Sequence, residues 1–373
     1  MQPSVQDWYH IKDLDQLDSP ALVVYPQRVK ANIDLALSMV GDPTRLRPHI
    51  KTHKSPDVTR LQLAAGIKKF KCATIAEAEM LAIAGAPDTF LAYQPIGPKI
   101  QRFITLVKKY PATKFSCLTD NEEALTAMAA AFAAAGLNIP VYLDLNIGMG
   151  RTGILPGAAA FQLYKNADAI EGVTPIGLHA YDGHIRDADY DQRKEKCDDA
   201  FTDVTALKRA LQQAGYTNVV VVAGGSPTFS IHCRRQEVEC SPGTFVYWDK
   251  GYSDACPEQG FLPAALVISR VVSLPAPGRL CLDLGHKSIA AENELTRRVS
   301  FLNAPDWKAI GQSEEHLVIQ APEEHGHHPG DPVYGLPIHI CPTVNLYERA
   351  YTIEEGQITG EWKNIARDKK LSI

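Results

Sequence analysis

The stretch KFKCATIAEAEMLAIAGAPDTFLAYQ, residues 69–94, contains the repeating unit of the fold. Residues 69–74 and 89–94 carry aromatic, β-branched and other apolar side chains, which favours strands. The residues between them, 74–86, follow a helical pattern that begins at Thr74, a good helix-capping residue. A strand, a helix and a second strand in succession predict a parallel βαβ unit.

The same alternation continues on both sides of this stretch. Further strands are predicted at 46–51, 114–119, 141–147, 176–182, 218–225 and 243–249, and further helices at 121–136 and 191–215. Eight strands alternating with helices over roughly 200 residues predict an α/β fold, a (β/α)₈ barrel of the TIM type. A doubly wound open sheet is the competing fold, but no GxGxxG motif follows the first strand. The link between the last two strands contains Pro227 and Pro242, so we expect that unit to be irregular.

The pattern changes after about residue 255. Runs such as AALVISRVVSLPAPGRLCLDLG and HLVIQAP carry β-branched residues broken by Pro and Gly. They predict a mostly antiparallel C-terminal β domain. We therefore expect a barrel domain over 19–254 and a β domain over 255–373, with residues 1–18 packing against the latter. The strand within 19–40 could join either domain.

Composition limits the classes of function. The chain has 373 residues, of which 22% are charged, and a net charge of −5, which gives no electrostatic case for binding nucleic acid. No apolar run reaches the length of a membrane span, and the N-terminus lacks a signal-peptide core, so we expect a cytoplasmic protein. The eight cysteines contain no CxxC. We interpret seven as packing residues and keep Cys341 as a candidate ligand.

In such a barrel the chemistry collects at the carboxyl ends of the strands. Lys51 ends the first predicted strand, with His49, His53 and Lys54 close by in the sequence. A partly desolvated lysine beside cationic groups has a lowered pKa and can attack an aldehyde. Most lysines are merely exposed, but few of those end a core strand.

The GGSPT stretch follows the seventh predicted strand. Its backbone N–H groups and the hydroxyls of Ser226 and Thr228 suit a phosphate, and this fold usually binds phosphate there. An isolated GGS is more often a plain turn. Here its position after the seventh predicted strand favours a phosphate site. A lysine that shares a rim with a phosphate site suggests pyridoxal 5'-phosphate. Other polar residues at predicted strand ends are Arg151, Tyr181, Asp182, His184, Tyr247 and Asp249.

Several motifs together resemble the D-threonine aldolase and D-serine dehydratase family. They are RPHIKTHK, GMGRTG, AYDGH, GGSPT, DLGHKS (283–288), SEEH (313–316) and HICPTVNLY (339–347). Members of this family are pyridoxal phosphate enzymes with an alanine racemase-like barrel and a C-terminal β domain. The resemblance covers nearly the whole chain. It implies a lyase that acts on D-3-hydroxy amino acids with pyridoxal phosphate and a divalent metal, as a homodimer whose sites are completed by the partner's β domain.

The resemblance also implies roles for single residues. Lys51 would hold the cofactor covalently, and Arg151 would contact its phenolic oxygen. Tyr181 would line the ring or the substrate. The remaining cofactor-binding residues that we expect are His49, Gly224, Gly225, Ser226, Thr228, Tyr247 and Asp249.

His339 and Cys341 match the family's two metal ligands near the C-terminus. Residues i and i+2 on a strand share one face, so an imidazole and a thiolate could converge on one ion. A thiolate favours zinc, with manganese or cobalt as alternatives. Without the resemblance, a buried cysteine beside an unrelated histidine would be the preferred interpretation.

Some of the motifs favour aldol cleavage and others favour dehydration. Family aldolases typically present His-x-Asp at the metal and dehydratases His-x-Cys, so Cys341 favours dehydration. Aldolases also place a histidine soon after the tyrosine of strand six, which Tyr181 and His184 supply at a shorter spacing. We predict retro-aldol cleavage to glycine and an aldehyde, with His184 as base, and keep D-serine dehydratase-type elimination as the alternative. A racemase would not need His339 and Cys341, and a non-catalytic cofactor carrier would usually lack the β domain.

Overall fold

The computed structural model describes residues 8–373, which divide into two units. The barrel unit comprises residues 34–51, 56–243 and 368–373. The β unit comprises the chain up to residue 33 together with 52–55 and 244–367. The domain boundaries predicted from the sequence, 19–254 and 255–373, stay a prediction.

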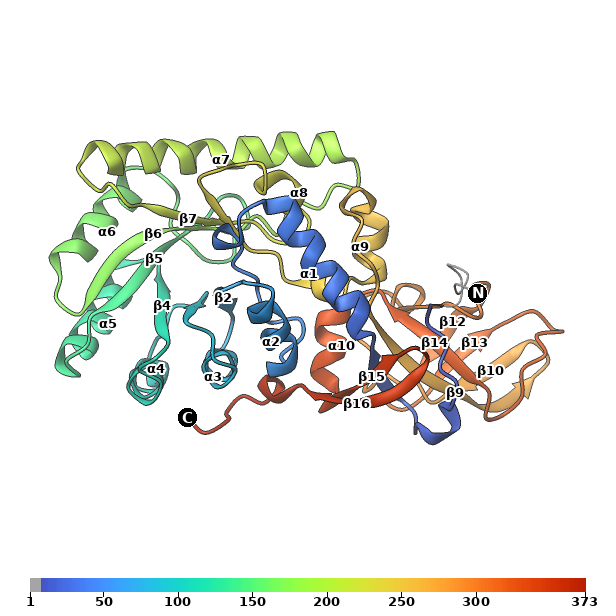
Figure 1. Ribbon diagram of the computed structural model, residues 1–373. Coiled ribbons are helices and arrows are strands. Elements are labelled where there is room, and N and C mark those ends of the chain that lie inside the picture. Colours follow the sequence, from blue (N-terminus) through green and yellow to red (C-terminus); the bar gives the residue numbers. More distant parts are fainter. Residues whose placement is uncertain (1–7) are drawn as a thin grey trace. The chain divides into compact units, whose positions relative to one another are not determined.

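Parallel strands form the sheet of the barrel unit. They are β2 (Lys69–Cys72), β3 (Asp88–Leu91), β4 (Lys114–Thr119), β5 (Ile139–Leu145), β6 (Val173–Ala180), β7 (Val220–Ala223) and β8 (Val238–Cys240), paired in chain order. Figure 1 shows that this sheet is curled and that helices follow its outer side. Phe90, Leu118, Tyr142 and Val222 pack together as a hydrophobic cluster from four different strands.

The helices of this unit connect successive strands. They are α2 (Pro56–Ala64), α3 (Ile75–Ile83), α4 (Pro98–Lys109), α5 (Glu122–Ala134), α6 (Ala158–Ala169), α7 (Tyr190–Gln213) and α8 (Phe229–His232). Thr74, Asn121 and Asp189 cap α3, α5 and α7, because each side chain accepts a hydrogen bond from a backbone N–H three residues on. Such a cap stabilises a helix by about 1 kcal/mol.

The first predicted strand survives as a short segment that joins the two ends of the sheet. Leu46 forms a parallel bridge with Cys240 of β8, and His49 forms one with Lys71 of β2. Arg47, which is 1% exposed, pairs with Asp88 at 2.5 Å and Glu239 at 2.7 Å. The segment thus takes the eighth position in the ring of strands, and the predicted α/β barrel class is confirmed.

The predicted last strand at 243–249 is wrong. The last strand is β8, and Thr244–Val246 is a 3₁₀ helix. The carbonyl of Thr244 accepts hydrogen bonds from the N–H groups of Tyr247 and Trp248, so this backbone is satisfied locally and needs no neighbouring strand. The short α8 makes the link from β7 to β8 irregular, as expected.

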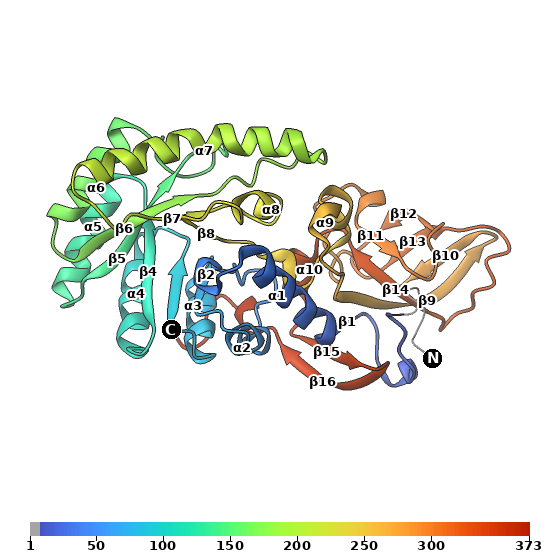
Figure 2. The same ribbon diagram turned by 45° about the horizontal axis from the view of Figure 1, so that its top comes forward.

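The β unit contains a nine-stranded sheet. Its strands are β1 (Ala21–Val24), β9 (Ala265–Ala276), β10 (Arg279–Leu282), β11 (Val299–Phe301), β12 (Lys308–Gln312), β13 (Leu317–Gln320), β14 (Pro332–Pro337), β15 (Arg349–Glu354) and β16 (Gln357–Lys363). Apart from the parallel pair of β1 and β15, neighbouring strands are antiparallel, as predicted. Figure 2 shows β10, β12 and β13 side by side.

The N-terminal strand β1 joins this sheet between β9 and β15, which answers a question that the sequence left open. Ile11, Leu14 and Leu17 pack in one hydrophobic cluster with Leu266 and Ile268 of β9. The expectation for residues 1–7 lies outside the described residues. The remaining helices are α1 (Pro26–Val40), α9 (Lys250–Ala255) and α10 (Ile340–Leu346). Within residues 8–373, no helix combines the length and apolarity needed to span a bilayer.

Candidate active site

A cavity of about 560 Å³ lies in the barrel unit. Four residues predicted from the sequence, His49, Lys51, Arg151 and Tyr181, line it together. They follow or end different strands of the ring, and the carboxyl ends of barrel strands are the usual place for a site. Three residues that the sequence did not single out, Lys71, Asp144 and His179, line the same cavity.

Lys51 follows the bridging segment directly. Its backbone N–H donates a hydrogen bond to Nδ1 of His49, at 3.3 Å. The expectation that His53 supplies a positive charge is wrong, because burial lowers the pKa of His53 to about 3. Lys71 lines the same cavity, and its pKa is lowered to about 7 by burial and by the charge of Lys51.

Tyr181 lies between cations and the glycine turn. The guanidinium carbon of Arg151 is 5.0 Å from the centre of the Tyr181 ring, and Nζ of Lys71 is 5.7 Å from it. A Cβ on Gly225 would lie 3.1 Å from the same ring, so the turn after β7 packs closely against it. The ring therefore links Arg151 to the GGSPT stretch.

Asp144 and His179 form a buried pair on the neighbouring strands β5 and β6. Nδ1 of His179 lies 2.7 Å from one carboxylate oxygen of Asp144, and the hydroxyl of Thr152 donates to the other at 2.7 Å. Burial lowers the pKa of His179, so the ring is neutral and Nδ1 carries the proton. Nε2 is then an acceptor, and within the described part of the chain this buried atom has no hydrogen-bond partner.

The GGSPT turn packs tightly against its neighbours. Gly224 has φ +78, and a Cβ there would lie 2.6 Å from the ring of His232. The N–H of Gly224 donates to the carbonyl of Ala180 at 3.0 Å. The N–H of Gly225 donates to the hydroxyl of Thr228, and the N–H of Gly243 donates to that of Ser226, each at 3.3 Å. A phosphate bound here would compete with these acceptors for the N–H groups.

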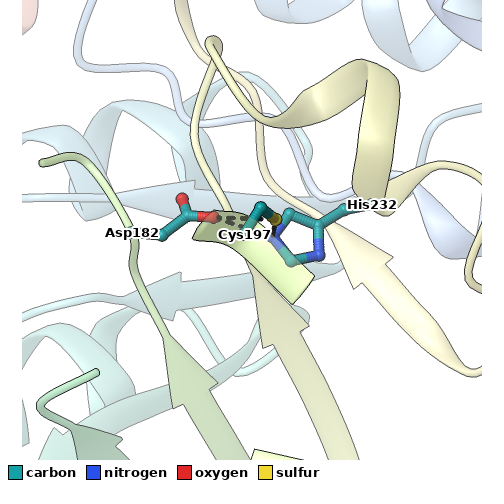
Figure 3. A group of neighbouring side chains, drawn as sticks. All are labelled: Asp182, Cys197 and His232. Carbon is teal, nitrogen blue, oxygen red and sulfur yellow. Dashed lines mark hydrogen bonds and ion pairs between the residues drawn. The ribbon is translucent and has the colours of Figure 1, made fainter. Parts of the chain in front are cut away.

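A buried polar cluster supports this turn (Figure 3). Nε2 of His232 lies 2.8 Å from Asp182 and 3.4 Å from the sulfur of Cys197, and these three ligand-type atoms lie within 4.8 Å of one another. The hydroxyl of Thr228 donates to the second oxygen of Asp182 at 2.8 Å. Burial, with the charge of Asp182, raises the pKa of Cys197 to about 12, so the thiol is a hydrogen-bond donor.

We interpret this cluster as the support of Thr228 and hence of the glycine turn. Cys197, which we expected only to pack, belongs to it. Its three members come from the end of β6, from α7 and from α8, and no sequence motif connects them.

His184 stands apart from the other predicted residues of the barrel unit. Its side chain is exposed and does not line the cavity. A Cβ on Gly148 would lie 2.6 Å from Nε2 of His184, so the imidazole rests on the GMGRTG loop that carries Arg151.

The other predicted residues belong to the β unit. Tyr247 and Asp249 are buried there. The carboxylate of Asp249 accepts hydrogen bonds from the N–H groups of Tyr252 at 2.9 Å and Ile340 at 3.0 Å. Asp249 thereby fixes the start of the segment that carries His339 and Cys341.

The expectation that His339 and Cys341 lie on a strand is wrong, because His339 caps α10 and Cys341 lies in its first turn. Pro342 fits there, since the first helical turn leaves its N–H groups unbonded. Nδ1 of His339 lies 2.5 Å from Glu292. The sulfur of Cys341 lies 3.0 Å from the hydroxyl of Thr52.

The surroundings of His339 suit a metal ligand. Contacts with Cys341 and Glu292 outweigh burial and raise the pKa of His339 to about 9, so an ion would have to displace a proton from this imidazole. A carboxylate on Nδ1 leaves Nε2 for an ion, which is the usual arrangement of metal-binding histidines. No sequence motif points to Glu292, which lies 47 residues before His339.

Comparisons with known proteins agree with this geometry. The chain is 27% identical to a D-threonine aldolase of Arthrobacter sp over 95% of this chain and 94% of that protein. It is 26% identical to a D-threo-3-hydroxyaspartate dehydratase of Delftia sp. (strain HT23), over 62% of each chain. The structure of D-threonine aldolase from Filomicrobium marinum matches with a TM-score of 0.88 and 25% identity, covering 96% of this chain and 98% of that one.

Two family models match successive parts of the chain. The model described as a putative serine dehydratase domain matches residues 264–353. The model described as the N-terminal domain of alanine racemase matches residues 24–250, more than half of the chain. The chain therefore belongs to the family defined by the alanine racemase N-terminal domain.

Proposed function

We propose that this protein is a pyridoxal phosphate-dependent lyase that also uses a divalent metal ion and acts on D-3-hydroxy amino acids. The observation that carries the proposal is the cavity that gathers Lys51, Arg151 and Tyr181, with the glycine turn packed against Tyr181. The relatives named above are an aldolase and a dehydratase, and both names describe lyases.

The residues present fit the cofactor. Lys51 would hold it covalently, Arg151 would contact its phenolic oxygen, and the turn from Gly224 to Thr228 would hold its phosphate. The unpartnered Nε2 of His179 also fits a polar ligand in this cavity. The resemblance adds Tyr181 and Tyr247 to the cofactor-binding residues, and position near predicted strand ends adds His49 and Asp249. The cofactor, when bound, would take up negative charge from the α-carbon of the substrate.

The residues present also fit a divalent ion. His339, oriented by Glu292, and Cys341 would hold it. The thiolate favours zinc, with manganese or cobalt as alternatives. The ion would supply Lewis acidity toward the β-hydroxyl of the substrate.

The two candidate reactions differ in what Lys51 and His184 must do. In aldol cleavage the hydroxyl proton leaves as the Cα–Cβ bond breaks, and the α-carbon must then gain a proton. His184 would take the hydroxyl proton, and the ammonium form of Lys51 would protonate the α-carbon and become the free amine. In elimination the amine of Lys51 takes the α-proton and the hydroxyl departs, so His184 is dispensable.

We propose cleavage to glycine and an aldehyde as the reaction, because Tyr181 and His184 follow β6 in the order that the family's aldolases show. Of the two, Tyr181 lines the cavity and His184 lies outside it. Elimination is the alternative, and the thiol of Cys341 favours it. We further propose a cytoplasmic homodimer, as the resemblance implies; a purely monomeric species in sedimentation would speak against the dimer.

Product analysis tests the proposed function. Purified protein is supplied with pyridoxal phosphate and zinc or manganese, and then with D-threonine or D-serine. Glycine and acetaldehyde from D-threonine are expected, and pyruvate and ammonia from D-serine would establish elimination. Lys51→Ala should be inactive, and His184→Asn should lose cleavage because no group then takes the hydroxyl proton.

L-Threonine serves as the stereochemical control and should not react. Full activity of the Lys51→Ala protein, or turnover of neither D-amino acid by the wild type, would overturn the proposal.

A further inference from the structure

Lys71 is a buried cation that the described protein residues do not neutralise. It lies in β2, is 2% exposed and lines the cavity with Lys51 and Arg151. No carboxylate within residues 8–373 lies at ion-pair distance from its ammonium. Burying a charge without a partner costs several kcal/mol, so such a group either loses its proton or awaits an anion.

The acidic groups that act on Lys71 are Asp144 and Asp182. Each already has its own hydrogen-bond partners. The two oxygens of Asp144 accept from His179 and Thr152. Those of Asp182 are bonded to Thr228 and His232. Both carboxylates favour the charged form of Lys71, but neither lies at ion-pair distance from its ammonium.

The remaining charges nearby are positive. Lys51 and Arg47 both disfavour the charged form of Lys71. Arg47 is balanced by Asp88 and Glu239, whereas Lys51 and Lys71 face the cavity. Arg151 and Lys71 also approach the same ring, that of Tyr181. This part of the cavity thus holds more positive than negative charge.

We propose that Lys71 is a further anion-binding residue of this cavity, whose ammonium pairs with an oxyanion supplied by the ligand. The inference rests on the proposed function. The oxyanion is either the ring oxygen of pyridoxal phosphate or the carboxylate of the amino acid substrate. In both cases the ligand provides a countercharge that residues 8–373 do not place within ion-pair distance.

Replacement by a neutral side chain of similar length tests the inference. Lys71→Met and wild type are compared as cofactor-free proteins, and pyridoxal phosphate is titrated while protein fluorescence and visible absorbance are recorded. Lys69→Met is the matched control, because Lys69 lies in the same strand but its ammonium pairs with Glu239. If the ring oxygen is the partner, Lys71→Met should bind the cofactor about 10- to 100-fold more weakly, the value of a lost charge-assisted hydrogen bond. Lys69→Met should bind it as the wild type does.

Folding is checked on the same samples. Cofactor-free Lys71→Met should melt at the same temperature as the wild type or higher, since it lacks the uncompensated charge. Lys71→Arg, which keeps the charge, should retain more affinity than Lys71→Met.

A second arm identifies the source of the anion. D-Alanine and ethylamine are titrated into the cofactor-loaded proteins and followed by absorbance. D-Alanine has no β-hydroxyl to react, and ethylamine has no carboxylate. If the carboxylate is the partner, Lys71→Met should weaken D-alanine but not ethylamine by about 10- to 100-fold, with cofactor affinity unchanged.

Two results would overturn the inference in distinguishable ways. Wild-type affinity of Lys71→Met for both pyridoxal phosphate and D-alanine would remove this inference and leave the proposed function standing. A wild-type protein that binds no pyridoxal phosphate would remove both.

Discussion

Asp144 accepts hydrogen bonds from His179 and Thr152 and so holds two elements at the cavity wall. The pair fixes which nitrogen of His179 carries the proton, and Nε2 is thereby left as an acceptor toward the cavity. The sequence did not single out Asp144 or His179, because an Asp and a His inside two strands resemble any other polar core residues. Their proximity follows from the parallel pairing of β5 with β6, in which Asp144 lies opposite His179.

At this scale we predict the effect of Asp144→Ala on stability. The substitution leaves the buried Nδ1–H of His179 and the hydroxyl of the exposed Thr152 without their acceptor. The free energy of unfolding should fall by about 2–4 kcal/mol, as for buried polar groups that lose their partner. Thr152→Val removes only one of the two bonds and should cost about 1 kcal/mol. Urea unfolding with matched m-values measures both; equal losses in the two variants would contradict the anchoring role of Asp144.

The turn after β7 is shaped by the elements around it. Its first glycine has a positive φ and faces His232 of α8, while Thr228 is tied to the end of β6. The sequence predicted a phosphate site here from the glycines, the two hydroxyls and the position after the seventh strand. It also placed Asp182 at a strand end, but not the contact of Asp182 with Cys197 and His232, since helix α7 brings Cys197 back to the sheet.

At this scale we predict that Gly224→Ala weakens cofactor binding. The new Cβ would lie 2.6 Å from the His232 ring and 3.1 Å from the Thr228 hydroxyl, so the turn must shift. Loss of one or more hydrogen bonds to the phosphate should lower affinity for pyridoxal phosphate by about tenfold or more.

Gly41→Ala is the matched control for this substitution. Gly41 has nearly the same φ, +76, but nothing within 4 Å of its added Cβ. It should lose stability from the backbone strain and keep its cofactor affinity. If both variants bound pyridoxal phosphate equally well, the turn would not be the phosphate site.

The candidate cofactor-binding and metal-binding residues of the chain are distributed over the two units. Lys51, Arg151 and the glycine turn belong to the barrel unit, and His339 and Cys341 belong to the β unit. Each set is held by bonds within its own unit, such as Asp182 to Thr228 and Glu292 to His339. Loss of the ion should therefore leave most cofactor-binding residues undisturbed.

At the scale of the whole molecule we predict that chelation of the metal abolishes activity but leaves the cofactor bound. Removing the divalent ion should abolish turnover of the D-3-hydroxy amino acid, while the visible absorbance of the bound cofactor stays nearly unchanged. Added zinc or manganese should restore turnover. His339→Ala should behave like the chelated protein, and His328→Ala, at an exposed position in the same unit, should behave like the wild type. Unchanged turnover after complete metal removal would contradict the metal-dependent mechanism and favour the racemase interpretation.

Several features were already determined by the sequence alone. The alternation of strands and helices gave the barrel, because hydrophobic periodicity and capping residues such as Thr74 act over a few neighbouring positions. Strand ends gave Lys51, Arg151 and Tyr181, because the carboxyl ends of parallel strands share one rim. The glycine turn was visible as a local motif.

Only the tertiary structure decided the rest. Lys71, Asp144 and His179 line one cavity because the ring brings β2 into reach of the neighbouring strands β5 and β6. Within the last predicted strand, 243–249, Thr244–Val246 is a 3₁₀ helix because the carbonyl of Thr244 bonds to nearby N–H groups. The last strand of the barrel unit is β8 instead. His339 and Cys341 lie at a helix start, where the Asp249 carboxylate fixes the backbone of Ile340. Local patterns set the elements, but burial and the pairing of charges depend on neighbours that sequence distance does not reveal.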